Sequence, residues 1–181
     1  LMKYRTKIFN LLEIGTWEGA STAAFASYFP YSKIYGIDKN FRFKYKSSRI
    51  CFNHCDIRNQ NDIKNLRKNI KNITFKVIID DASHMLSDMI YSLNFFLKYL
   101  ESGGFFVIED FNAPIYFKAL NDCDGKEIFM EEIFRHIIKR KQFKSNILSK
   151  DDQKFLFENI SDIKIYKGKT DISDIAFLKK S

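Results

Sequence analysis

The stretch Leu11-Leu12-Glu13-Ile14-Gly15-Thr16-Trp17-Glu18-Gly19-Ala20-Ser21-Thr22 decides the fold predicted for this chain. A short apolar run ends in Gly15, and an alanine-rich helical pattern opens near Gly19 and stops at Pro30. This order is typical of a buried parallel strand that turns directly into a helix. Ligands of open α/β sheets bind just outside the carboxyl ends of such strands, so we expect a ligand site at this turn.

The same alternation of strand and helix continues along the chain. Strands are expected at 8–14, 32–37, 75–79, 105–108 and, more weakly, 49–53. Helices are expected over 20–28, 60–70 and 86–100, the last followed by Gly103-Gly104 as a stop. Such alternation favours a doubly wound parallel sheet with right-handed crossovers.

The pattern changes after residue 110. The stretch 112–125 has no clear period, and an amphipathic helix is expected over 126–143. Ser149 and Asp152 have the spacing of a capping box, which predicts a helix over 149–159. The stretches 163–166 and 174–178 predict a terminal antiparallel hairpin. No repeat, low-complexity tract or linker is visible, so we predict one domain over 1–181.

Composition limits the class of protein. The chain has 181 residues and a net charge of +8, and no run of 18 apolar residues indicates a transmembrane helix. The segment 1–5 lacks the apolar region of a secretory signal, and three cysteines without a CxxC pair argue against a disulfide scaffold or structural zinc. We expect a cytoplasmic protein. The basic and aromatic segment 39–46 suggests a polyanionic partner, but no nucleic-acid-binding module accompanies it.

The first turn constrains the ligand. Gly15 and Gly19 would let a ligand approach the backbone, but their GxxxG spacing fits a dinucleotide pyrophosphate poorly. Glu13 would repel phosphate and suits an ammonium group. The alternative is a tight turn without a ligand.

Two further acids follow neighbouring strands. Asp38, about 20 residues after the glycine turn, can accept both hydroxyls of a ribose. Asp56 could accept from an adenine amino group while Ile57 packs on the ring. The alternatives are a helix cap or solvated acid at Asp38 and an ordinary loop acid at Asp56.

The order ExGxxxG, acid after strand two and acid after strand three resembles the class I S-adenosylmethionine-dependent methyltransferases, over nearly the whole chain. The resemblance implies a Rossmann-like, mostly parallel seven-stranded sheet with an antiparallel C-terminal hairpin. It divides the domain into a cofactor half of about 1–110, an acceptor-side insertion of about 111–160 and a terminal hairpin of about 162–179. The cofactor-binding residues it implies are Glu13, Gly15, Thr16, Gly19, Ser21, Asp38, Asp56, Ile57 and Asp80.

Two later segments, 77–84 (VIIDDASH) and 103–111 (GGFFVIEDF), resemble the macrolide sugar O-methyltransferases of the mycinamicin type and the related cephalosporin hydroxylase-like group. Carried over by position, Asp81, Glu109 and Asp110 would hold Mg²⁺, with His84 as general base and Asp81 also catalytic. Ala82 replaces the usual glycine, and a positive φ there would cost on the order of 1 kcal/mol. The chain also starts almost at the first strand, without the amino-terminal region of such enzymes.

Physical chemistry supports the same assignment. Three carboxylates at the ends of adjacent strands raise each other's pKa unless a cation lies among them, and hard oxygen ligands suit Mg²⁺. Together with this chemistry, the resemblance implies Mg²⁺-assisted O-methylation of a sugar or small polyol as the expected function. The alternatives are metal-independent N-methylation of a small amine and a nucleic-acid-binding methyltransferase-like module. We expect a small-molecule acceptor, no membrane partner and no nucleic acid. The sequence is compatible with a homo-oligomer but leaves the oligomeric state open.

Overall fold

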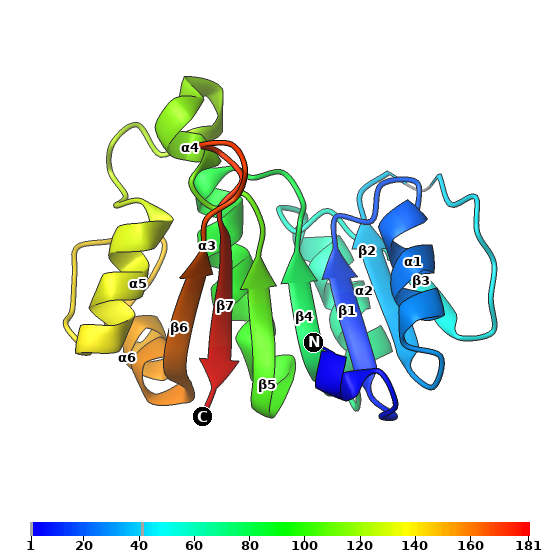
Figure 1. Ribbon diagram of the computed structural model, residues 1–181. Helices are drawn as coiled ribbons and strands as arrows, with labels where there is room; N and C mark the ends of the chain where they lie inside the picture. The colour runs from blue at the N-terminus through cyan, green and yellow to red at the C-terminus, as the bar shows by residue number, and fades with distance from the viewer. Residues whose placement is uncertain (1, 41) are drawn as a thin grey trace.

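The computed structural model describes residues 2–40 and 42–181, and its centre is a seven-stranded sheet within those residues (Figure 1). The order of the strands is β3-β2-β1-β4-β5-β7-β6. Strands β1 to β5 are parallel, and β7 runs antiparallel to both β5 and β6. This arrangement confirms the predicted Rossmann-like sheet with its C-terminal hairpin. The strands are β1 (Asn10–Ile14), β2 (Lys33–Asp38), β3 (Ile50–His54), β4 (Phe75–Asp80), β5 (Leu100–Ile108), β6 (Ile160–Tyr166) and β7 (Ile175–Lys180).

Helices cover the sheet on both faces. The α-helices are α1 (Ala20–Tyr28), α2 (Gln60–Ile70), α3 (Leu86–Phe96), α4 (Ala113–Tyr116), α5 (Met130–Lys139) and α6 (Lys150–Asn159). Short 3₁₀ turns occur at η1 (Met2–Tyr4), η2 (Leu97–Tyr99) and η3 (Lys118–Leu120). No helix in these described ranges is long and apolar enough to cross a membrane.

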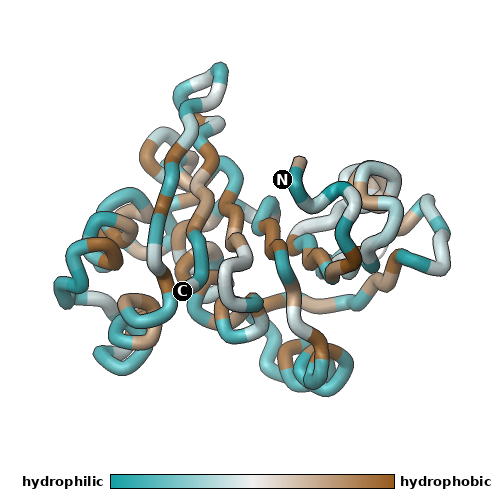
Figure 2. Tube along the Cα trace, turned by 60° about the horizontal axis from the view of Figure 1, so that its bottom comes forward, coloured by the Kyte–Doolittle hydropathy of each residue, from teal (hydrophilic) through white to brown (hydrophobic). Residues whose placement is uncertain are grey.

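The apolar core lies in two layers. The larger cluster joins one face of the strands to α2, α3, α5 and α6, and the smaller one lies between α1 and the other face. Alternate strand residues supply the two layers, so Leu12 and Ile78 belong to the first while Leu11 and Val77 belong to the second. Figure 2 shows the hydrophobic residues along the central strands and the hydrophilic ones along the outer segments.

The structure corrects the predicted helix over 126–143. Helix α5 spans only Met130–Lys139 and ends at Arg140, whose φ of 50° is left-handed. The segments that flank α5 are not helical and are joined by the side chain of Glu127. Its buried carboxylate accepts hydrogen bonds from the Ser145 hydroxyl (2.6 Å) and the backbone N–H of Ile147 (3.2 Å). Apolar residues beyond α5, such as Phe143, still pack on the core, which made the amphipathic pattern look longer than the helix.

The predicted helix over 86–100 is also too long, and Gly103-Gly104 does not stop it. Helix α3 ends at Phe96, η2 follows, and Leu100 begins β5. A Cβ on Gly104 would lie 2.8 Å from the carbonyl oxygen of Lys76 in β4. The glycines therefore belong to an irregular part of the β4–β5 ladder, where the two backbones approach closely.

Other boundaries shift by a few residues. Strand β1 begins at Asn10, because Ile8 is 87% exposed and makes no part of the core. The capping box is confirmed: Ser149 accepts from the backbone of Asp152, whose carboxylate accepts from Ser149. In the basic segment 39–46, Phe41 lies outside the described residues, as does Leu1 at the start of the chain.

Candidate functional site

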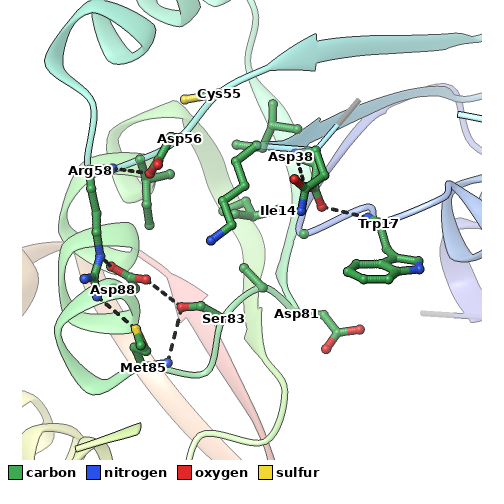
Figure 3. Close-up of a pocket in the computed structure, with 16 residues that line it drawn as sticks. Ile14, Trp17, Asp38, Cys55, Asp56, Arg58, Asp81, Ser83, Met85 and Asp88 are labelled. Atoms are coloured by element: carbon green, nitrogen blue, oxygen red, sulfur yellow. Dashed lines mark hydrogen bonds and ion pairs between the residues drawn. The ribbon is translucent and has the colours of Figure 1, made fainter. Parts of the chain in front are cut away.

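A cavity of about 410 Å³ opens at the carboxyl ends of β1, β2 and β4 (Figure 3). Its volume is in the range of small-molecule sites. Apolar walls come from Ile14, Ile37 and Ile57, and carboxylates enter from several loops. Of the residues predicted to bind a cofactor, four line it: Gly15, Asp38, Asp56 and Ile57.

The two glycines of the turn after β1 pack closely against other segments of the chain. Gly15 has a φ of +89°, and a Cβ there would lie 2.3 Å from the Asp81 carbonyl oxygen. Gly19 has a φ of +87°, and its Cβ would meet the ring of Phe52 at 3.1 Å. Gly15 thus lets the loop after β4 lie directly on the loop after β1. The structure explains both glycines through these contacts, without a ligand.

Glu13 lies beneath the turn, on the α1 side of the sheet, and does not line the cavity. Its carboxylate accepts a hydrogen bond from the Thr22 hydroxyl. Burial raises its pKa, while the hydroxyls of Ser21 and Thr22 partly counter the shift. Glu13 therefore ties β1 to the first turn of α1. Thr16, Gly19 and Ser21 also lie outside the cavity lining, and the buried Thr16 hydroxyl makes no hydrogen bond to the part of the chain that the structure describes.

Asp38 organises the mouth of the cavity. Its two carboxylate oxygens accept the backbone N–H groups of Trp17 and Asn40, each at 2.7 Å. Trp17 has a φ of 48° and is 69% exposed. Each carboxylate oxygen has two acceptor sites, so Asp38 keeps capacity for a ligand hydroxyl.

The opposite wall carries residues that the sequence analysis did not single out. Asp56 accepts from the backbone N–H of Arg58 (2.9 Å), and the Arg58 guanidinium pairs with Asp88 at 2.5 Å. Asp88 also accepts from the hydroxyl of Ser83 at 2.6 Å. Figure 3 shows Arg58, Met85, Ser83 and Asp88 on one side of the cavity, and Asp38 and Trp17 on the other. The signal that could have found Arg58, Ser83, Met85 and Asp88 is their position in the loops after β3 and β4 or at the start of α3.

Asp80 does not line the cavity. It is 4% exposed, and burial raises its pKa to about 7. The Ser92 hydroxyl of α3 partly offsets that shift, but no hydrogen bond within the described residues satisfies Asp80 Oδ2. Asp80 therefore sits in the core between β4 and α3.

The predicted catalytic groups lie at the next positions of β4 and β5. The backbone N–H of Asp81 donates to Ile14 and that of Glu109 to Asp80, so the ladders extend past both strand ends. Burial, with repulsion from Asp81 and Asp110, raises the pKa of Glu109 to about 7. Burial also raises the pKa of Asp81, although His84 opposes the shift. His84 Nε2 lies 3.5 Å from Asp81 Oδ1.

The three carboxylates therefore repel one another, but they are not closed around a common point. Within residues 2–40 and 42–181, no group of three or more His, Cys, Asp or Glu side chains is arranged to hold a metal ion. The structure places Asp81 and His84 in contact. Glu109 and Asp110 act on Asp81 and on each other through charge repulsion.

Backbone strain concentrates at this edge of the sheet. Trp17, His84 and Asp110 have φ values of 48°, 53° and 50°. Non-glycine residues at positive φ cost free energy and cluster at functional sites. In the loop after β4, the positive φ falls on His84 and not on Ala82. Alanine at position 82 therefore carries no strain of the kind anticipated.

Comparison with known proteins identifies the fold and the family. The model of a family described as a methyltransferase domain matches residues 12–111. Over 115 residues the chain is 31% identical to mycinamicin VI 2''-O-methyltransferase of Micromonospora griseorubida, covering 59% of this chain and 28% of that protein. Over 118 residues it is 32% identical to L-olivosyl-oleandolide 3-O-methyltransferase of Streptomyces antibioticus, covering 61% and 30%.

A solved structure agrees over the whole described fold. MycE methyltransferase from the mycinamycin biosynthetic pathway, in complex with Mg, SAH and mycinamycin VI, has a TM-score of 0.77 at 22% identity. The match covers 99% of this chain and 46% of that one. The chain spans less than a third of the length of the two curated relatives. Since the family model matches more than half of it, this chain belongs to the methyltransferase domain family.

Proposed function

We propose that this chain transfers a methyl group from S-adenosylmethionine to a hydroxyl of a sugar or small polyol, with Mg²⁺ held at the ends of β4 and β5. The observation that carries the proposal is the Asp81–His84 pair, 3.5 Å apart, at a cavity lined by Gly15, Asp38 and Asp56. The two curated relatives are named as O-methyltransferases of mycinamicin VI and of L-olivosyl-oleandolide, which supports a hydroxyl group as the acceptor.

The cavity fits S-adenosylmethionine. Asp38 would accept the ribose hydroxyls, Asp56 would accept from the adenine amino group, and Ile57 would pack on the adenine ring. These residues would hold the cofactor and fix its direction, which is the main contribution an enzyme makes to transfer from an already activated sulfonium. Bound S-adenosylmethionine supplies the methyl group.

The carboxylates at the ends of β4 and β5 fit Mg²⁺ by their chemistry. Asp81, Glu109 and Asp110 offer hard oxygen ligands. Burial is the main cause of the raised pKa of Glu109, and repulsion from Asp81 and Asp110, which a cation would relieve, adds to it. Bound Mg²⁺ would lower the pKa of an acceptor hydroxyl and orient it.

His84 would remove the proton from the acceptor hydroxyl. Asp81 lies on the Nε2 side of the ring and would stabilise the imidazolium that forms. The left-handed backbone at His84 fixes the direction of the imidazole. The stretch 111–129 lies beside this edge, and its exposed Tyr116 and Phe117 would contact the acceptor.

The test is calorimetric titration of S-adenosylhomocysteine into the protein, followed by Mg²⁺ into the saturated complex. We expect micromolar cofactor binding and then a Mg²⁺ signal that Asp81→Ala abolishes. The matched control is Asp151→Ala in α6, which should leave both signals unchanged.

Two other results would overturn parts of the proposal. Cofactor binding without a Mg²⁺ signal, together with full turnover in EDTA, would replace it with metal-independent methylation of an amine. Absence of cofactor binding, together with association with RNA that weakens steeply with salt, would replace it with a nucleic-acid-binding module.

A further inference from the structure

Arg58 joins three segments that are far apart in the sequence. Its Nε pairs with Asp88 at 2.5 Å, at the start of α3. Its Nη2 pairs with Asp122 at 2.7 Å and lies 3.1 Å from the hydroxyl of Ser87. Asp122 belongs to the stretch after β5, so one guanidinium links the loop after β3, the start of α3 and the segment on the acceptor side.

Asp122 is held from two directions. Besides Arg58, the backbone N–H of Ser87 donates to it at 3.0 Å and the Ser87 hydroxyl at 2.5 Å. Partial burial acts to raise the pKa of Asp122, but the hydrogen bonds from Ser87 and Arg58 lower it overall. Asp122 therefore stays charged and fixed in position. Among the hydrogen bonds of the described residues, it is the one member of 117–125 that is bonded to α3.

Only one partner of this pair faces the cofactor cavity. Arg58 lines the cavity next to Asp56 and Ile57, whereas Asp122 does not line it. About half of the Arg58 side chain is exposed, so water weakens its attraction to both carboxylates. A ligand that covers the guanidinium removes that water and strengthens both pairs. Arginine is suited to this role because its planar fork holds two carboxylates in fixed directions.

We propose that Arg58 is a positioning residue that couples occupation of the cofactor cavity to the placement of residues 117–125 through Asp122. The inference rests on the proposed function, because it takes S-adenosylmethionine as the occupant of the cavity. Coupling between two sites is reciprocal, so Asp122 in turn strengthens cofactor binding without touching the cofactor. The segment next to the acceptor is then held more tightly when the methyl donor is present.

The test compares hydrogen exchange and cofactor affinity in two matched variants. S-adenosylhomocysteine is the probe, with wild type, Asp122→Asn and Asp124→Asn. Asp124 is two residues away, has a φ of 49° that asparagine tolerates, and serves as the control. In wild type and control, the probe should slow amide exchange in 117–125 about tenfold. In Asp122→Asn the slowing of exchange should disappear. The dissociation constant of the probe should rise about fivefold, which is the lower end of the range for coupling between two sites.

A purely structural role predicts a different pattern. Asp122→Asn would then lower the melting temperature but leave the probe-dependent difference in exchange unchanged, and that result would overturn the coupling. Arg58→Lys adds an independent variant, since lysine keeps the charge but loses the fork and should also abolish the slowing. If wild type binds the probe with no change in 117–125, the coupling is wrong while the proposed function stands. If wild type does not bind the probe, both are wrong.

Discussion

The backbone N–H of Trp17 donates to Asp38 Oδ2 at 2.7 Å, which joins the loop after β1 to the end of β2. The same carboxylate accepts from Asn40 through its other oxygen. Asp38 thus holds the left-handed backbone of Trp17 at the mouth of the cavity. One carboxylate both shapes the site and would bind the ribose.

Asp38→Ala should weaken binding of S-adenosylhomocysteine by roughly 10- to 100-fold, because hydrogen bonds to a charged group contribute about 1.5–3 kcal/mol. The variant should remain folded, since Asp38 is the last residue of β2 and lies outside the apolar core. Calorimetry measures the affinity, with Asp162→Ala in β6 as the control. Unchanged affinity would mean that the ribose is held elsewhere.

Trp17 should report cofactor binding by its fluorescence. It is the one tryptophan of the chain, is largely exposed, and lines the cavity. A bound adenosine would exclude water from the indole, so the emission should change in a saturable way with the affinity found by calorimetry. Trp17→Phe should lose the signal and keep the affinity within about threefold. Heat of binding without any change in emission would contradict this placement of the indole.

Gly15→Ala should destabilise the protein far more than Gly125→Ala. Both positions have positive φ, which costs alanine about 1–2 kcal/mol. Only at Gly15 does the new methyl meet backbone, at 2.3 Å from the Asp81 carbonyl oxygen, while Gly125 has open space. We expect losses in the free energy of unfolding of roughly 3 kcal/mol and about 1 kcal/mol, respectively, from urea titration. Equal losses would show that the loops after β1 and β4 do not need this contact.

Asp152 should stabilise α6 in a pH-dependent way. Burial acts to raise its pKa, but hydrogen bonds from Ser149 and Asn94 lower it overall. A carboxyl whose folded pKa is depressed contributes stability above its unfolded pKa of about 3.9, and that contribution is lost as the pH falls through the folded value. Asp152→Asn should therefore cost on the order of 1 kcal/mol at pH 6, and the difference from wild type should shrink below about pH 4.

Urea titrations from pH 6 to pH 3.5 measure this difference. Asp151→Asn, an exposed neighbour in the same helical turn, is the control for charge alone. A difference that stays constant over the whole range would show that the charge of Asp152 does not support the cap.

Local patterns predicted the sheet, the glycine turn and the positions of Asp38, Asp56 and Asp81, because each depends on a strand end and its next few residues. Contacts between distant segments could not be predicted. Arg58 and Asp122 are 64 residues apart, and the second lies where the sequence has no period. Likewise, Gly15 is explained by the backbone of Asp81, which only the β1–β4 pairing brings near. The pattern around Glu13 shows its neighbours along the chain but not the side of the sheet that it faces, which is the α1 side in the structure.

His84→Asn should lower turnover by roughly 10²-fold or more and leave the affinity for S-adenosylhomocysteine unchanged. Asparagine tolerates the left-handed backbone that His84 adopts, so the substitution removes the base without straining the loop. Turnover is measured as cofactor product released with an acceptor that carries vicinal hydroxyls. The control is His136→Asn in α5. Within the described residues, the hydrogen bond of the His136 ring is to the Lys141 carbonyl. A proton acceptor at His84 affects the chemical step and not the binding step, so a loss of both together would instead make His84 part of the cofactor pocket. Near-normal turnover in His84→Asn would remove it from the chemistry and leave Asp81 as the base.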